Sequence, residues 1–140
     1  MDPTLPPQPQ PDVDTAPFWS ATTAGELAIC RCTQCGLWLQ PPAERCRSCA
    51  GPTRFEPVGG DGTLFSFIVA HQPSSPGYLD ELPYAIGLVE LAEQPGLRLP
   101  MRVVGAEAAS LAVGAAVRVE LEDLRGADVK VPVARPVPTG

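Results

Sequence analysis

Four cysteines in two Cys-x2-Cys pairs constrain this 140-residue chain more than any other feature. Cys32 and Cys35 form the first pair, ten residues follow, and Cys46 and Cys49 form the second. This spacing is typical of a zinc ribbon, in which each pair lies on a tight turn and four sulfurs surround one ion at about 2.3 Å. Because four thiolates fill every tetrahedral position, we expect a structural Zn²⁺ that stabilises the fold and does not catalyse.

The fifth cysteine, Cys30, lies two residues before the first pair. It could compete as a ligand, but Cys-x2-Cys makes the better metal-binding turn, so we predict that Cys30 is a small buried hydrophobic residue. An odd cysteine count, with four in metal spacing, argues against a disulfide framework and favours the cytoplasm. Gly36 follows the first pair and relieves the backbone where the turn bends back.

Composition and charge argue against several functional classes. A net charge of -6 disfavours a general binder of nucleic acid or anionic membranes, since those depend on basic surface. No apolar run approaches the roughly 20 residues of a membrane span, and the start of the sequence lacks a signal peptide's basic and apolar regions. A hydrophobic content of 44% supports a core, with room for one compact domain and one small module.

The chain is predicted to divide into five segments. Proline alternates with polar residues at the start, which favours disorder or extended polyproline structure. Thr15 as a cap, Pro17 in the first turn and Gly25 at the end then predict a short helix. The segments are a leader (1–14), this helix (15–25), a zinc ribbon (26–57), a β-rich domain (58–136) and a tail (137–140).

Strand patterns fill the ribbon and the domain that follows. In the ribbon, residues 26–31 read as a strand, and residues 37–39 form an apolar arm before Pro41 and Pro42 reverse the chain. Beyond Gly59 we predict five strands: 63–72, 84–91, 97–104, the alternating stretch around residues 117–121, and 129–133. The loop 73–83 carries Tyr78 and Leu79, which look exposed, and a helical turn is possible at 108–111. A five-stranded oligonucleotide/oligosaccharide-binding (OB) barrel fits this pattern, and an open sheet is the alternative.

The order of a short aromatic helix, a four-cysteine ribbon and a small β-barrel resembles the DUF35 family, described as OB-fold acyl-CoA-associated proteins with a rubredoxin-like zinc ribbon. The resemblance spans about residues 16–136. It rests on Phe18-Trp19, Gly25-Glu26-Leu27, Arg31-Cys32 to Cys35-Gly36, Pro41-Pro42, Cys46 to Cys49, Gly60-Asp61-Gly62-Thr63, Leu82-Pro83-Tyr84, Val89-Glu90-Leu91, Val113-Gly114 with Val117, and Val131-Pro132-Val133. Departures from the family pattern are Cys30 and Arg47, where other residues are usual, and a missing aromatic in the last strand.

The resemblance implies a non-catalytic subunit that helps a thiolase-like enzyme to bind acyl-CoA. The partner would be a thiolase, an aldolase or a hydroxymethylglutaryl-CoA synthase, in acyl-CoA, lipid or steroid side-chain metabolism. It would carry the catalytic cysteine or base.

Candidate ligand-binding residues follow from the chemistry of coenzyme A. Between residues 31 and 54, four arginines (Arg31, Arg45, Arg47 and Arg54) accompany a single acid, Glu44, so this side of the chain is expected to face the phosphates, chiefly through Arg45 and Arg47. The arginines could equally screen the thiolates. Phe67, Tyr78 and Tyr84 are candidates to line an acyl or pantetheine groove, or they pack in core and loops.

Phe18 and Trp19 are candidate partner contacts, because a helix this short needs fewer large aromatics for its own core. Being adjacent, they are expected on different faces, with one on the ribbon. Packing against the parent domain is the alternative.

Nothing in the sequence predicts a self-sufficient enzyme. His71 is the only histidine, no orienting carboxylate can be assigned to it, and no Ser-His-Asp pattern or phosphate-binding glycine loop is present. We therefore expect a solvated His71 and no catalytic residue. The alternative function is a nucleic-acid-binding module of ribbon and barrel, which the acidic residues of the barrel strands (Glu90, Glu120, Glu122 and Asp123) disfavour.

Overall fold

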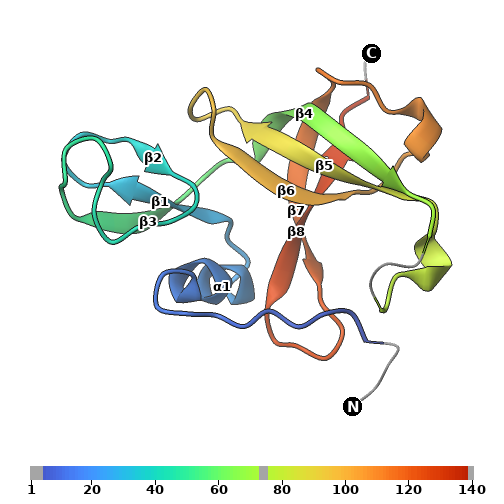
Figure 1. Cartoon of the computed structure of the whole chain (residues 1–140), viewed down its shortest axis with the longest axis horizontal. Coiled ribbons are helices and arrows are strands. Elements are labelled where there is room, and N and C mark those ends of the chain that lie inside the picture. Colours follow the sequence, from blue (N-terminus) through green and yellow to red (C-terminus); the bar gives the residue numbers. More distant parts are fainter. Residues whose placement is uncertain (1–4, 73–75, 139–140) are drawn as a thin grey trace.

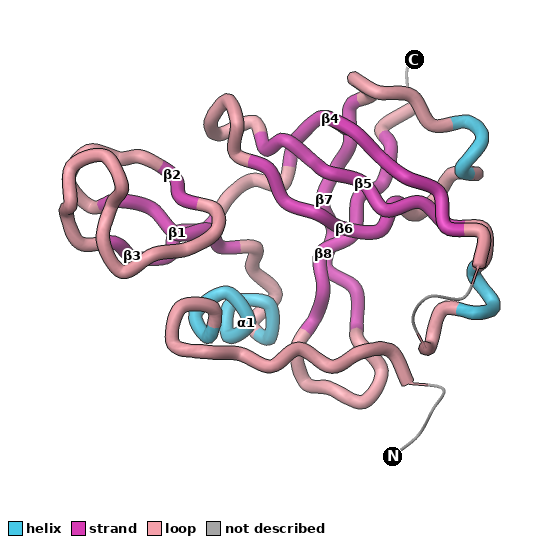
Figure 2. Tube along the Cα trace, viewed as in Figure 1, coloured by secondary structure: helices cyan, strands magenta, loops and turns pink. Residues whose placement is uncertain are grey.

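A short helix followed by two small β-structures makes up the computed structural model, which describes residues 5–72 and 76–138 (Figure 1). The elements are α1 (Ala16–Thr23), β1 (Ala28–Cys32), β2 (Trp38–Leu39), β3 (Thr53–Pro57), β4 (Asp61–Ala70), β5 (Tyr84–Leu91), β6 (Arg98–Val103), β7 (Ala116–Asp123) and β8 (Lys130–Pro136), with 3₁₀ turns η1 (Leu79–Glu81) and η2 (Ala108–Ser110). Among the described residues, strands dominate and helix is confined to α1 and the two 3₁₀ turns (Figure 2). The predicted mostly β class is confirmed.

Helix α1 ends as predicted but begins differently. Gly25 adopts φ +86°, and the N–H of Glu26 donates to the carbonyl of Ala21 at 2.9 Å, so the helix closes in a Schellman motif. Thr15 occupies the N-cap position, yet its hydroxyl accepts from the N–H of Asp12 at 3.0 Å and leaves the first turn uncapped. The predicted Thr15 side-chain cap is therefore wrong, because the turn at Asp12 competes for the same oxygen.

The zinc-ribbon segment forms a three-stranded sheet with the order β2-β1-β3. The sequence analysis did not identify β3, whose five residues mix charged, aromatic and proline side chains; it pairs with the whole of β1. Cys30 is 1% exposed and packs with Leu39 beneath the metal-binding turns. The prediction that Cys30 is a buried hydrophobic residue agrees with this position.

The remaining strands close into a barrel with the order β4-β5-β6-β8-β7, and this closure excludes the open-sheet alternative. All five predicted strands are present, and residues 108–110 form the expected helical turn. Leu64, Val89 and Val117 are almost fully buried at the barrel centre. The same cluster includes Ile29 and Trp38, so ribbon and barrel share one hydrophobic core. This shared core fixes the ribbon against the barrel.

The described part of the leader runs without helix or strand until the turn at residue 12. Pro6 is buried and lies very close to Gly77, and Gln8 donates through Nε2 to the carbonyl of Arg125 at 2.9 Å. The leader therefore contacts two loops at one end of the barrel, the β4–β5 loop and the β7–β8 loop. Of the predicted segments, residues 1–4, 73–75 and 139–140 lie outside the described residues. No helix in the described part of the chain is long and apolar enough to cross a membrane.

Candidate functional site

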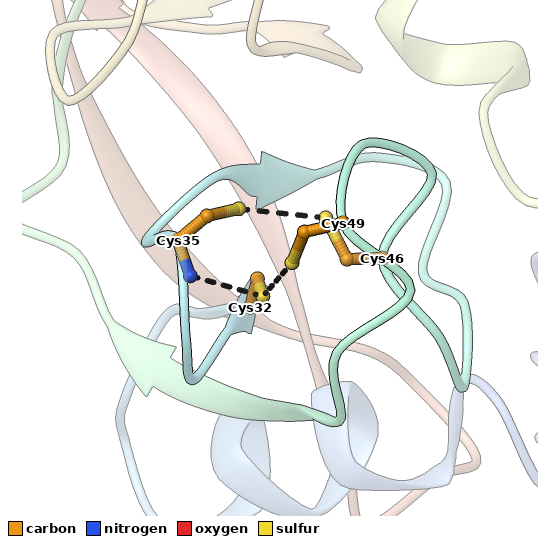
Figure 3. A group of neighbouring side chains, drawn as sticks. All are labelled: Cys32, Cys35, Cys46 and Cys49. Carbon is orange, nitrogen blue, oxygen red and sulfur yellow. Dashed lines mark hydrogen bonds between the residues drawn. The ribbon is translucent and has the colours of Figure 1, made fainter.

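The four predicted cysteines meet at the end of the ribbon (Figure 3). All four sulfurs lie within 4.8 Å of one another, with 3.4 Å between Sγ of Cys32 and Cys49 and 3.6 Å between Sγ of Cys35 and Cys46. A tetrahedron of sulfurs about 2.3 Å from a central ion has edges of about 3.8 Å. The cluster therefore fits a tetrahedral four-thiolate metal site.

Backbone amides point at the sulfurs and favour thiolates. The N–H groups of Gln34 and Cys35 donate to Sγ of Cys32, each at 3.4 Å, and the N–H of Ser48 donates to Sγ of Cys46 at 3.3 Å. The amide of Cys35 is the main cause that lowers the pKa of Cys32 to about 6. The N–H of Leu37 acts to lower the pKa of Cys35, but burial and the neighbouring sulfurs raise it to about 12. Crowded thiolates repel one another, which a bound cation would relieve.

The two metal-binding turns have the same backbone shape. In each, the N–H following the second cysteine donates to the carbonyl of the first: Gly36 to Cys32 at 3.2 Å and Ala50 to Cys46 at 2.9 Å. Gly36 and Ala50 have φ of +79° and +61°. Both residues are therefore in the left-handed region. Glycine adopts this conformation readily, so the first turn is relaxed at Gly36, whereas Ala50 in the second turn adopts it at a steric cost.

The charge on the ribbon is lower than the arginine count suggested. Glu56, which lies outside residues 31–54, accepts from Arg31 at 3.0 Å and from Arg54 at 2.9 Å. The hydrogen bonds from Arg54 and then Arg31 lower the pKa of Glu56. Arg45 and Arg47 are exposed and form no ion pair within the described residues. Two of the four arginines therefore share one acid outside residues 31–54, which lowers the local net charge by one.

A groove of about 380 Å³ lies where α1, the ribbon and the barrel meet. Its walls are mostly apolar and come from all three parts of the chain. The lining residues are Thr15, Phe18 and Trp19 from the helical segment; Gln40, Pro42 and Phe55 from the ribbon; and Tyr78, Leu99, Pro100, Met101, Arg102, Val131, Pro132 and Val133 from the barrel. Its volume falls within the range of small-molecule sites, about 300–1,000 Å³.

Phe18 and Trp19 both line this groove, which corrects the expectation that they face different ways. Their ring centroids are 5.0 Å apart and the planes meet at 88°, an edge-to-face pair. Phe18 also packs against the shared core, while both residues remain partly exposed. Adjacent residues near the start of a short helix can converge when their rings stack edge to face.

Tyr78 joins Phe18 and Trp19 in the groove, held there by a residue that the sequence analysis missed. The guanidinium of Arg102 lies 4.8 Å from the Tyr78 ring centroid. Its side chain, 13% exposed, also pairs with Glu81 at 2.8 Å and with Glu122. The sequence did not single out this arginine, because it lies within a β-strand and its two partners are each about twenty residues away, one in the β4–β5 connection and one in β7.

The other candidates lie outside the groove. Tyr84 is 9% exposed and its ring centroid is 5.9 Å from that of Tyr78, so it supports the groove residue from behind. Phe67 packs against the barrel core. Arg45 and Arg47 lie on the second metal-binding turn, and His71 is exposed directly after β4. Their roles in ligand binding stay predictions.

Comparison with known families and structures points in one direction. Residues 55–122 match the family model for the C-terminal OB-fold domain of ChsH2. A solved structure titled Ltp2-ChsH2(DUF35) aldolase contains a chain that is 32% identical and superposes with a TM-score of 0.83, covering 92% of this chain and 98% of that one. A DUF35 protein of unknown function from Sulfolobus solfataricus, 14% identical with a TM-score of 0.57 (86% and 82% covered), shares the fold.

Two curated relatives are subunits of hydratases. The 3-oxo-4,17-pregnadiene-20-carboxyl-CoA hydratase alpha subunit of Mycobacterium tuberculosis is 36% identical over 118 residues, which is 84% of this chain and 37% of that protein. A probable enoyl-CoA hydratase alpha subunit of Thermomonospora curvata is 34% identical over 134 residues, 94% of this chain and 40% of that protein. The chain thus spans about two fifths of the length of these relatives.

Proposed function

Because this chain belongs to the DUF35 family, among its ChsH2-like members, we propose that it is a non-catalytic accessory subunit that binds an acyl-CoA thioester beside a thiolase-like enzyme. The solved relative is named as part of an aldolase, and one relative is named for a steroid-derived CoA thioester. The proposed substrate class is accordingly a CoA thioester from steroid side-chain metabolism, and the proposed partner is an aldolase of the thiolase superfamily.

The groove between helix, ribbon and barrel is the observation that carries this proposal. Phe18, Trp19 and Tyr78 offer aromatic surface at one place, next to the apolar side chains of Leu99 and Met101. Such walls suit a thioester that is largely apolar near its sulfur. None of the described residues that line the groove is a histidine, cysteine, aspartate or glutamate, which supports leaving proton transfer and nucleophilic attack to the partner.

We propose that the four-cysteine cluster holds Zn²⁺ and serves stability. Four sulfurs in a closed set are the ligands of structural zinc, and Phe55, which lines the groove, also packs against the buried group that contains Cys32 and Cys46. When bound, the ion supplies a fixed centre for both turns. It would thereby hold in place the ribbon residues that line the groove, which are Phe55 of β3 and Gln40 and Pro42 after β2. We place the complex in the cytoplasm, where free thiols and CoA thioesters are both found.

Calorimetric titration tests the proposal. The zinc-loaded chain would be titrated with 3-oxo-4,17-pregnadiene-20-carboxyl-CoA, alone and in the presence of the Ltp2 aldolase named with the solved relative; a single-stranded oligonucleotide serves as the control ligand. We expect saturable binding of the thioester and co-elution with the aldolase. Trp19→Ala should weaken thioester binding about 10-fold, since buried aromatic contacts contribute more than 1 kcal/mol. Val13→Ala, an exposed residue outside the groove, is the matched control.

The outcomes separate the candidate functions. No thioester binding under either condition would reject the accessory-subunit function. Binding of the oligonucleotide but not of the thioester would favour the nucleic-acid-binding module. Trp19→Ala should then leave the affinity for the oligonucleotide unchanged, because the barrel face would bind it.

A further inference from the structure

The barrel is joined between β6 and β8 by a short parallel ladder. In the described residues this ladder has two residue pairs, Arg102 with Val133 and Val103 with Ala134. The N–H of Val104 donates to the carbonyl of Ala134 at 2.8 Å and marks one end of the ladder. Before Arg102, β6 continues from Arg98 but no longer pairs with β8. The groove begins at this parting of the two strands, because residues on both sides of it line the cavity.

Two prolines stop the ladder. In a parallel ladder with this register, the next two bonds would run from the N–H of residue 132 to the carbonyl of Pro100 and from the N–H of residue 100 to the carbonyl of Lys130. Pro132 and Pro100 have no N–H to donate. Two consecutive hydrogen bonds of the ladder therefore cannot form, and the strands separate there. The cause is one proline in each strand.

The parting leaves acceptors without donors. The N–H of Lys130, which would also have faced β6, donates instead to Oγ1 of Thr22 on α1 at 3.2 Å. The helix thus satisfies the freed donor of β8. In the antiparallel register of β5 and β6, Pro100 lies opposite Leu88 at a non-hydrogen-bonded position, so its carbonyl faces the β8 side. Within the described residues, no backbone hydrogen bond from outside the strand ladders reaches this carbonyl, and Pro100 itself lines the groove. This edge of the groove can accept N–H groups but has none to offer at positions 100 and 132.

We propose that the parted seam between β6 and β8 binds the pantetheine arm of the CoA thioester, with an amide N–H of the arm donating to the carbonyl of Pro100. The inference rests on the proposed function and names which part of the ligand the groove takes. The pantetheine arm is an extended chain with two amide groups, so it can supply the donor that Pro132 lacks. Its methylene stretches would lie against the aromatic walls formed by Trp19 and Tyr78.

The charge of the groove indicates that the nucleotide part of the CoA thioester binds elsewhere. Arg102 is the charged side chain among the described lining residues, and it already pairs with Glu81 and Glu122. The site therefore has no uncommitted cation for phosphates. The arm, rather than the nucleotide, matches a groove of apolar walls and backbone acceptors. A partner's peptide strand would also bring N–H donors, and it is an outcome of the test below.

A ligand series on the unaltered protein tests the inference. Four probes would be titrated: the CoA thioester, the acyl-pantetheine with the same acyl group, that acyl-pantetheine with both amide nitrogens methylated, and 3′-phospho-ADP, which has neither arm nor acyl group. We expect acyl-pantetheine to bind within about 10-fold of the CoA thioester. Methylation should weaken binding about 10-fold, the equivalent of about 1.4 kcal/mol, because one hydrogen bond is lost and its acceptor is left unpaired.

A variant that restores the missing donor provides a second measurement. Pro132→Val places an N–H opposite the carbonyl of Pro100, so the ladder can extend by one rung and narrow the groove. We expect protection of the new amide at position 132 from hydrogen exchange and about 10-fold weaker binding of acyl-pantetheine. Pro136→Val is the matched control, because Pro136 is on the same strand but does not line the groove.

Two results would overturn the inference while leaving the proposed function intact. One is equal binding of the methylated and unmethylated arms by a protein that binds the CoA thioester. The other is a protected amide at position 132 in Pro132→Val with unchanged affinity. Binding of an extended peptide in competition with acyl-pantetheine, at higher affinity, would assign the seam to a partner strand. Absence of any CoA thioester binding, by contrast, would reject the proposed function itself.

Discussion

Thr22 and Lys130 are hydrogen-bonded across 108 residues of sequence. Oγ1 of Thr22 accepts from the backbone N–H of Lys130 and donates to the carbonyl of Trp19 at 2.7 Å. Thr22 is fully buried, and its hydroxyl fixes α1 against the freed edge of β8. This hydroxyl group therefore links the helical turn that carries Trp19 directly to β8.

Thr22→Val should destabilise the protein by about 1–3 kcal/mol, because it keeps the side-chain shape but leaves a buried N–H without a partner. Thermal unfolding and Trp fluorescence would measure the loss of stability and the displacement of Trp19. Thr23→Val is the control, since Thr23 is exposed and its hydroxyl makes only a 3.3 Å hydrogen bond to the same carbonyl. Equal effects of the two variants would contradict the assigned role of Thr22.

Ala50→Gly should stabilise the zinc-loaded protein by about 1 kcal/mol, because Ala50 adopts φ +61° and glycine accepts that conformation without steric cost. Gly36→Ala should destabilise it by a similar amount, since a Cβ added there would meet only ordinary contacts and the cost lies in the backbone. Urea unfolding of both variants checks the pair. An unchanged midpoint for Ala50→Gly would show that the second turn carries no strain.

Metal removal should unfold the ribbon sheet and release one equivalent of zinc per chain. Cys35→Ser is expected to weaken metal affinity at least about 100-fold, because the tetrahedral set loses one thiolate. Cys30→Ala should keep one zinc per chain, although it opens a small space beneath Leu39. Metal analysis of the purified variants, with competition by a chelator, provides the measurement. Loss of zinc from Cys30→Ala would assign Cys30 to the site.

Glu56→Gln should lower stability at pH 7, and the difference from the unaltered protein should shrink as the pH falls. The hydrogen bonds from Arg54 and Arg31 hold the pKa of Glu56 below its ordinary value of 4.5. A depressed pKa contributes stability above 4.5 that is lost as the pH falls through the folded-state value. NMR titration of the carboxyl group and paired unfolding curves check both parts. Glu44→Gln, which alters an exposed acid of the same ribbon, is the control variant.

Gln8→Ala should loosen the loops at the end of the barrel. It removes the hydrogen bond to the carbonyl of Arg125, so amides at residues 76–78 and 125–127 should exchange about 5-fold faster, the equivalent of about 1 kcal/mol. Hydrogen-exchange mass spectrometry gives the readout. Gln10→Ala is the matched control, because Gln10 is exposed in the same leader. Identical exchange in both variants would mean that the leader does not support the Tyr78 loop.

The sequence alone identified the features that depend on local pattern. The spacing from Cys32 to Cys49 predicts four sulfurs around one ion, and the alternation at Val117 and Val119 predicts a half-buried strand. These signals are local because turns and pleats repeat over two to four residues. The five barrel strands and the ribbon could be placed in this way, except β3, whose mixed composition gives no period.

The groove was decided by the tertiary structure. Which aromatic residues meet depends on how α1 and the barrel pack, so Tyr78 joins Phe18 and Trp19 while Phe67 turns into the core. Arg102 is held beside the Tyr78 ring by ion pairs with Glu81 and Glu122, which are distant in sequence. Pro100 and Pro132 can be read from the sequence. The missing N–H of a proline removes a ladder hydrogen bond, however, only where another strand lies opposite it. Long-range pairing decides which strands those are, and no local pattern encodes it.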